Sequence, residues 1–197
     1  MADPLTTNKR LVLASASPRR RELLERCGCR FAVRPADIDE QARSGEAPAE
    51  YVERMAKEKA LAVQQHMPDC FVLGADTAVV AAGVILGKPQ SDQQARTMLE
   101  QLSAGVHQVY SAVALACPDG RCLGQLSVTE VAFAELSADW IERYVRSGDG
   151  RDKAGAYGIQ NEAGLWIRHI SGSYSGVVGL PLYETAELLR EAGLINA

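Results

Sequence analysis

Three consecutive arginines follow directly on a Ser-Pro pair, and they raise the first chemical question about this sequence. Ser17 and Pro18 predict the start of a helix, because serine is a preferred N-cap and proline suits the first helical position. Residues 19–21 then lie at the positive end of the helix dipole, which is unfavourable for cations. A bound polyanion would make them ligands through charge-assisted hydrogen bonds. The alternative is that all three are solvated.

The segment before this helix favours the polyanion. Residues 11–15 predict a short buried strand, and small residues lead from it into the helix. Backbone N–H groups at such a strand–turn–helix junction point at whatever lies beyond the strand. The hydroxyls of Ser15 and Ser17 add hydrogen-bond donors, so the junction is a candidate polyanion site.

A lysine lies on the apolar face of a second predicted helix, over residues 48–65. The apolar stripe runs through Val52, Met55 and Ala56, and helical spacing then places Lys59 on the same face. A lysine in that position either extends its ammonium group to the rim of the core or meets an anion. The helix alone leaves both interpretations open.

An acidic residue interrupts an apolar strand that we predict over residues 71–80. Burying the carboxylate of Asp76 is unfavourable unless it is paired or bound to a metal. Gly74 and Ala75 leave space for another group to approach. The structural alternative is a carboxylate that accepts hydrogen bonds from a turn at the strand end. We favour a functional role because the segment carries no other charge.

Two further charged residues are weaker candidates. Glu40 ends an acidic loop that could supply a metal ligand, although such loops are commonly just solvated. Lys88 lies in a GKPQ segment, but this is no phosphate-binding P-loop, because Pro89 stands where that motif needs Ser or Thr. His66, His107 and His169 are scattered and lack the spacing of a zinc site.

Composition narrows the class of protein. With 197 residues the chain is expected to form a single domain over residues 1–197, with residues 1–10 as a tail. A net charge of −4 argues against a general nucleic-acid surface. We expect no membrane span, because the apolar runs are shorter than ~20 residues, and no signal peptide. The five cysteines contain no Cys-x-x-Cys pair, which predicts free thiols in a reducing cytoplasm.

Strand and helix patterns alternate along the chain. Strands are predicted over residues 11–15, 30–35, 71–80, 84–88, 106–117, 121–136 and 165–174. Helices are predicted over residues 18–27, 48–65, 91–102, 137–147 and 181–192. The long hairpin around residues 118–120 argues against a purely parallel sheet, so we predict a mixed-sheet α/β or α+β fold.

Together, these residues favour one chemistry. Cations at a helix start, two further lysines and carboxylates suited to a divalent metal are what a nucleotide polyphosphate with Mg²⁺ requires. No pairing of Ser or Cys with His is evident for covalent catalysis. Attack of water on phosphorus, assisted by a metal, is therefore the simplest reaction.

The chain resembles the Maf family of nucleoside triphosphate pyrophosphatases over roughly residues 11–189. The resemblance rests on separate segments in the family's order, namely LASASPRRRELL, DIDE, KEKA, GADTAVV, GKP, DKAGAYGIQ and GSYSGVVGLPLYET. It implies an α/β fold with two lobes around a nucleotide cleft, related to that of the inosine triphosphate pyrophosphatases. It also implies cleavage between the α- and β-phosphates, which yields a nucleoside monophosphate and pyrophosphate.

The resemblance also implies roles for single residues. Asp76 falls on the family's proposed proton acceptor, and a second group falls on its polar cleft residues: Ser15, Arg20, Glu40, Lys59 and Lys88. A third group falls on positions linked to base selection: Arg19, Thr77 and Gln160. The GAYGIQ segment resembles the branch that acts on dTTP and UTP, and other modified or noncanonical nucleotides stay open. One departure is Ala16, where glycine is common.

Several alternatives stay open at this point. The expected cofactor is Mg²⁺ or Mn²⁺, held by Glu40 with Asp76, and Asp76 can be the base, a metal ligand or both. A nucleotide-binding regulator with little turnover and a sugar-nucleotide hydrolase are the rival functions. The expected partner is the nucleotide substrate, without nucleic acid or membrane, and a homodimer stays open.

Overall fold

A mixed β-sheet runs through the protein, which the computed structural model describes over residues 10–196. The strands are β1 (Leu11–Leu13), β2 (Phe31–Val33), β3 (Phe71–Ala81), β4 (Val84–Leu86), β5 (Val106–Ala116), β6 (Cys122–Phe133) and β7 (Ile167–Ser171). Their order is β2-β1-β3-β5-β6-β7, and β4 pairs with β3. β1 lies parallel to β2 and β3, and the remaining pairs are antiparallel. The predicted mixed-sheet α/β class is confirmed.

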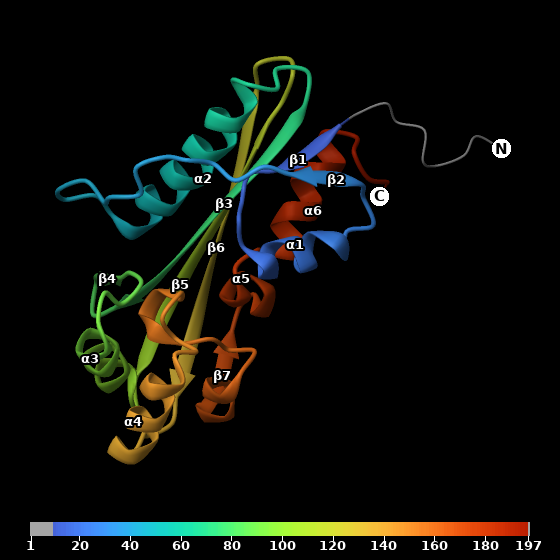
Figure 1. Ribbon diagram of the computed structural model, residues 1–197. Helices are drawn as coiled ribbons and strands as arrows, with labels where there is room; N and C mark the ends of the chain where they lie inside the picture. The colour runs from blue at the N-terminus through green and yellow to red at the C-terminus, as the bar shows by residue number, and fades with distance from the viewer. Residues whose placement is uncertain (1–9, 197) are drawn as a thin grey trace.

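The helices are grouped in two halves of the molecule, one toward each end of the long strands (Figure 1). They are α1 (Pro18–Glu25), α2 (Pro48–Gln64), α3 (Asp92–Leu102), α4 (Ala138–Ser147), α5 (Tyr174–Val178) and α6 (Leu182–Glu191), with short 3-10 turns η1 (Ala154–Ala156) and η2 (Glu162–Trp166). One half, which we call the α2 half, holds β1, β2, α1, α2 and α6. The other, the α4 half, holds β4, α3, α4 and β7, and the long strands β3, β5 and β6 run through both.

Each half has its own apolar core. In β1, Leu11 and Leu13 pack in the cluster that includes α1 and α6, whereas Val12 faces the cluster under α2. The alternation follows from the period of two in a strand that is covered on both faces. The core of the α4 half is built from β-strand and helix residues that include Phe133 and Trp140. Ala78 of β3 packs with Ala112 and Ala114 of β5 in a further cluster under α2, so apolar packing also continues through the middle of the sheet.

The edge of β3 that faces β1 has a gap. β1 pairs with Phe71–Leu73 and β4 pairs with Val79–Ala81, while β5 covers the opposite edge from Val72 to Val80. The residues between these two partners, 74–78, therefore meet no strand on the first edge. Asp76 lies at the centre of this gap, which begins where β1 ends and the chain turns into α1.

A glycine lets α2 approach the sheet beside the gap. A Cβ atom at Gly74 would lie 2.1 Å from the carbonyl oxygen of Ala56 and 2.7 Å from the backbone nitrogen of Ala60. These distances are far below van der Waals contact, so no other residue fits without displacing the helix. The close approach brings the face of α2 that carries Lys59 onto β3.

The structure differs from the prediction near the C-terminus and agrees on the cysteines. In place of one strand over residues 165–174 it has β7 and then α5, because the hydroxyl of Ser173 caps the backbone N–H of Gly176. Of the predicted tail, residues 1–9 lie outside the described residues, and Arg10 instead continues β1 through its carbonyl, which accepts a hydrogen bond from Phe71. All five cysteines are described and free. Within residues 10–196 no helix combines the length and apolar character needed to cross a bilayer.

Candidate active site

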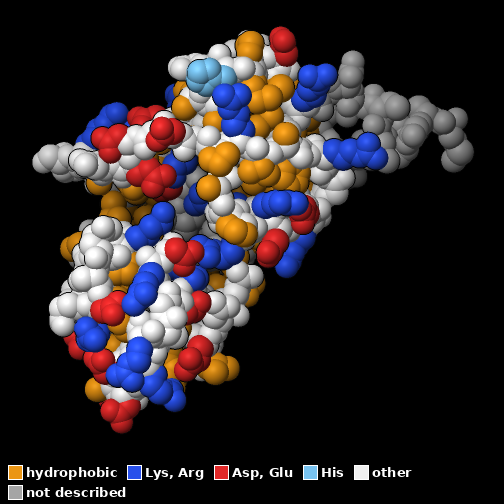
Figure 2. Space-filling view, in the orientation of Figure 1, with side chains coloured by type: hydrophobic (Ala, Val, Ile, Leu, Met, Phe, Trp, Pro, Cys, Tyr) orange, Lys and Arg blue, Asp and Glu red, His pale blue; other side chains and the backbone are white. Residues whose placement is uncertain are grey.

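The gap in β3 opens into a cavity of about 970 Å³. Every site residue expected from the sequence lines it: Ser15, Arg19, Arg20, Glu40, Lys59, Asp76, Thr77, Lys88 and Gln160. Figure 2 shows Lys, Arg, Asp and Glu side chains gathered at the waist between the two halves. The structure thus brings together residues from widely separated segments, as one polar cleft requires.

A lysine bridges two carboxylates on the floor of the cavity. Lys59 Nζ lies 2.7 Å from Asp76 Oδ1 and 2.6 Å from Glu40 Oε1. Lys59 and Asp76 are only 6% and 7% exposed, whereas Glu40 reaches in from an exposed loop. Each buried charge therefore has an ionic partner, which such burial requires. The choice left open for Lys59 is settled, because its ammonium group meets anions.

Nearby cations hold Glu40 in its anionic form. Partial burial raises the pKa of the Glu40 carboxyl, but the hydrogen bond from Lys59 and the charges of Lys59, Lys88 and Arg20 outweigh this, so its pKa lies below the ordinary value. The hydroxyl of Tyr51 on α2 donates to the backbone carbonyl of Glu40 at 2.9 Å and fixes the loop. Burial and the charges of Asp76 and Glu40 raise the pKa of Tyr51 to about 12.

The Ser-Pro turn has the predicted helix cap, and one of its backbone N–H groups donates to a side chain of the same turn. The hydroxyl of Ser17 accepts the backbone N–H of Arg20, and Pro18 is the first residue of α1. The backbone N–H of Ser17 donates to Ser15 Oγ at 3.2 Å, so it is not free for a ligand in this structure. The Ser15 hydroxyl can still donate its own proton into the cavity.

The three arginines have three different surroundings. Arg21 forms an exposed ion pair with Glu25 one turn later, so for this residue the solvated alternative is correct. Arg19 reaches across the cleft to Asp152, with 3.1 Å between Nη1 and Oδ2. Arg20 lines the cavity and is the one of the three without a carboxylate partner among the described residues.

A single backbone carbonyl aligns Arg20 and Thr77. Gly179 O accepts a hydrogen bond from Arg20 Nε at 2.8 Å and a longer one from Thr77 Oγ1 at 3.4 Å. Thr77 also shares a hydrogen bond of 2.9 Å with Ser111 on β5. Gly179 has φ of +136°, a conformation that favours glycine. Burial lowers the pKa of the Arg20 guanidinium, and the charges of Asp76 and Glu40 partly offset this.

Lys88 and Gln160 both line the cavity. Lys88 follows β4 and is exposed, as is Gln160 in the loop between η1 and η2. Lys88 is close enough for its charge to lower the pKa of Glu40. Exposed side chains that line a cleft can both reach a ligand that fills it.

Sequence reasoning missed several residues that line the cavity. Asp152 and Lys153 form an ion pair of 2.8 Å beside Arg19, and Asn161 and Tyr51 also face the cavity. Asp152 and Lys153 belong to the DKAGAYGIQ segment, and its resemblance to the family could have indicated them. An Asp-Lys pair in a glycine-rich stretch is nevertheless typical of a solvated turn. No sequence pattern indicated a role for Tyr51.

The two carboxylates on Lys59 suit a metal that shares its ligands with a substrate. Among residues 10–196 no group of three or more His, Cys, Asp and Glu side chains could hold a metal ion. Glu40 and Asp76 alone provide hard oxygen donors, and Mg²⁺ is commonly bound by one or two carboxylates together with phosphate oxygens. The donor set therefore fits Mg²⁺ or Mn²⁺ bound jointly with a triphosphate.

Two proteins that are similar to this chain over nearly its whole length share a name. The Hahella chejuensis protein called dTTP/UTP pyrophosphatase is 51% identical over 197 residues, covering 98% of both chains. The Alcanivorax borkumensis protein of the same name is 54% identical over 186 residues, covering 93% of this chain and 96% of its own. Solved structures include a HAM1 protein from Coxiella burnetii, at 18% identity and a TM-score of 0.48 over 93% of this chain and 98% of that one.

The comparison with protein families agrees with these relatives. Residues 10–192 match the family model described as Maf-like protein. The matched range spans the SPRRR turn, the gap in β3, the cavity and the last helix. The chain belongs to the Maf family.

Proposed function

We propose that the chain is a nucleoside triphosphate pyrophosphatase that hydrolyses dTTP and UTP to the nucleoside monophosphate and pyrophosphate. The observation that carries the proposal is the Asp76–Lys59–Glu40 cluster, placed in a cavity whose walls present Arg20 and Lys88. Carboxylates beside cations in one cleft suit a metal-bound triphosphate better than a neutral ligand. The names of the relatives support the same reaction.

The triphosphate lies against the cations of the cavity. Arg20 offers both Nη groups, because its Nε is engaged by Gly179 O. Lys88 closes the other side, and the Ser15 hydroxyl donates from the turn before α1. A triphosphate relieves the desolvated charge of Arg20, which lacks a carboxylate partner among the described residues.

Asp76 takes the proton of the attacking water. Lys59 engages Oδ1, so Oδ2 can accept a proton while the carboxylate stays oriented. Water attacks the α-phosphorus, the bond from this phosphorus to the oxygen that bridges it to the β-phosphorus breaks, and pyrophosphate leaves with the electron pair. Glu40 and Asp76 would hold Mg²⁺ or Mn²⁺, which would neutralise charge on the phosphate oxygens.

The base lies between the SPRRR turn and the loop that carries Gln160. A side-chain amide can donate to a uracil oxygen and accept from its N3–H, whereas purines present a different order of donors and acceptors. Arg19 and Thr77 line the same cavity and complete the base-selecting group. The whole chain acts as one domain, in the cytoplasm, where its free thiols stay reduced.

A nucleotide panel tests the proposal. dTTP, UTP, CTP, ATP and 7-methyl-GTP are incubated with Mg²⁺ or Mn²⁺, and the products are identified by chromatography. We expect monophosphate and pyrophosphate, fastest from dTTP and UTP, with turnover abolished by EDTA and restored by either metal. Release of single phosphate, or a profile led by 7-methyl-GTP, contradicts the proposal. Tight binding without turnover identifies a regulator, and activity on nucleoside diphosphate sugars alone identifies a sugar-nucleotide hydrolase.

A further inference from the structure

A carboxylate outside the cavity holds the loop that carries Gln160. Asp149 follows the C-terminal glycine of α4, and its side chain is 23% exposed. Its Oδ2 accepts the hydroxyl proton of Tyr144 at 2.7 Å. Its Oδ1 accepts from Asn161 Nδ2 and, at 3.4 Å, from Lys153 Nζ. One carboxylate thus receives three side-chain donors from three parts of the chain.

These donors hold Gln160 from both sides along the chain. Asn161 directly follows Gln160 in the chain. Gly158 lies two residues before Gln160, and its backbone N–H donates to the Tyr144 hydroxyl at 3.1 Å. Tyr144 is 1% exposed, so this hydroxyl is a fixed point. Gln160 itself is exposed, and among residues 10–196 its position is set by the backbone on either side of it.

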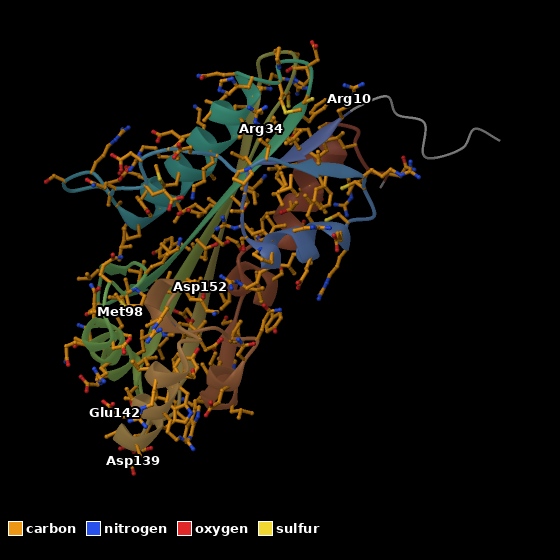
Figure 3. The ribbon with its side chains drawn as sticks, viewed as in Figure 1. Arg10, Arg34, Met98, Asp139, Glu142 and Asp152 are labelled. Carbon is orange, nitrogen blue, oxygen red and sulfur yellow. The ribbon has the colours of Figure 1, made fainter. Side chains whose placement is uncertain are left out.

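The same network reaches Arg19 across the cleft. Lys153 lies between Asp149 and Asp152, and Asp152 Oδ2 binds Arg19 Nη1. Figure 3 shows Asp152 at the waist of the molecule, between the two halves. The stem of Lys153 lies directly over Gly158, where a Cβ atom would come within 2.7 Å of its Cε. The lysine is therefore clamped onto the loop.

We propose that Asp149 is a positioning residue for base selection, acting through Asn161 and Lys153 on Gln160 and Arg19. The inference rests on the proposed function, because it assigns the base to this side of the cavity. Asp149 does not itself line the cavity, whereas Asn161 and Lys153, which donate to it, do, so it acts through them and not by contact with the substrate. It fixes where the base-reading groups stand before a nucleotide arrives, and so limits which bases they can pair.

The chemistry of the cluster requires an anion at this position. Burial raises the pKa of Asp149, but the hydrogen bonds from Tyr144 and Asn161 and the charge of Lys153 outweigh it, so the pKa lies below the ordinary value. An amide in its place has one acceptor oxygen instead of two and carries no charge. Asp149→Asn therefore leaves the proton of either Tyr144 or Asn161 without this acceptor, with little change in side-chain size.

The test compares Asp149→Asn with Asp139→Asn, the same change at an exposed position in the first turn of α4. Figure 3 shows Asp139 far from Asp152, at the outer end of the α4 half. We measure kcat/KM for UTP and ATP, and the affinities of the α,β-methylene analogues of both nucleotides. We expect Asp149→Asn to lower the UTP-to-ATP ratio about fivefold or more in both measurements, the size of one lost hydrogen bond. Asp139→Asn should leave the ratio unchanged.

A second substitution distinguishes a positioning role of Asp149 from a general loss of order in the surrounding loop. In a Gln160→Ala background, Asp149→Asn should lower the ratio less than it does in the wild-type protein, because only the route through Lys153 and Asp152 to Arg19 remains. Additive losses, or an unchanged ratio in a folded Asp149→Asn protein, overturn the inference. Should Asp149→Asn fail to fold, Tyr144→Phe frees the backbone of Gly158 and must lower the ratio in its place. A wild-type protein that binds the analogues selectively without hydrolysis would defeat the proposed function alone.

Discussion

Arg20 donates its Nε–H to the backbone carbonyl of Gly179 over 2.8 Å, although the two residues are 159 positions apart in the chain. The bond joins the first turn of α1 to the end of α5. It answers the question raised by three arginines at the positive end of a helix. Arg19 and Arg21 have carboxylate partners, and Arg20 is held by a neutral acceptor that leaves its charge for a ligand.

Arg20→Ala should weaken triphosphate binding. A hydrogen bond to a charged group contributes about 1.5–3 kcal/mol, so KM should rise about tenfold or more. Arg21→Ala is the matched control, because it removes an arginine whose partner Glu25 is exposed. Steady-state kinetics with UTP on both variants measure the effect. Equal KM values for the two variants would contradict the role given to Arg20.

Asp76→Asn should lower kcat about 10²-fold or more, the usual size for a general base. The amide keeps the shape of the side chain and removes the charge that accepts the proton. Nucleotide binding, measured by calorimetry, should survive in part because Glu40 still pairs with Lys59. Circular dichroism verifies the fold. Turnover near the wild-type rate would move the catalytic role to another residue, with Glu40 next.

Gly74→Ala should destabilise the protein and reduce its activity together. The new methyl group would overlap the backbone of Ala56, and overpacking of this kind typically costs about 1–3 kcal/mol. Relief requires α2 to move outward, which carries Lys59 away from Asp76. The control is Gly124→Ala in β6, where the nearest atom to the new Cβ is 3.8 Å away. Urea titrations in which both variants lose equal stability would disprove the close-packing argument.

His107 should make the protein less stable in mild acid. Burial lowers the pKa of its imidazole from 6.5 to about 4. The unfolded chain then binds a proton that the folded chain refuses, so stability falls as the pH drops from about 6.5 to about 4. Between pH 7 and pH 5 this amounts to about 2 kcal/mol of unfolding free energy.

Substitution isolates that contribution. His107→Gln should reduce the loss of stability between pH 7 and pH 5 by roughly that 2 kcal/mol, whatever its effect at neutral pH. His66→Gln, at an exposed histidine, should leave the pH dependence as it is. Urea unfolding at a series of pH values gives both slopes. An unchanged slope for His107→Gln would show that another group limits stability in acid.

Much of the architecture could be predicted from local patterns. The apolar spacing of α2 and the run of β3 identified both elements and placed Lys59 and Asp76 on buried faces. Asp76 was expected to need a partner, and Lys59 either to meet an anion or to reach the rim of the core, but nothing local indicates that they pair with each other. That depends on the depth at which α2 docks, which Gly74 determines through a contact between elements.

Long-range polar contacts were beyond prediction for the same reason. Arg19 and Asp152 are 133 positions apart, and each is an ordinary charged residue in its own segment. α5 was missed because five residues are too few for a helical pattern to be visible. The expected roles of Gln160 and Lys88 came from family resemblance, since neither stands out by burial or periodicity.

The strands β3, β5 and β6 pass from one half of the molecule to the other without a break, over 11, 11 and 12 residues. Two lobes joined by a flexible linker can rotate relative to each other as rigid bodies. Here any relative movement of the two halves must bend or twist three hydrogen-bonded strands at once. The connection between the two halves therefore resists bending and does not act as a hinge. The walls of the cavity can tighten on a nucleotide only by small amplitudes, so the enzyme recognises its substrate with a largely preset opening.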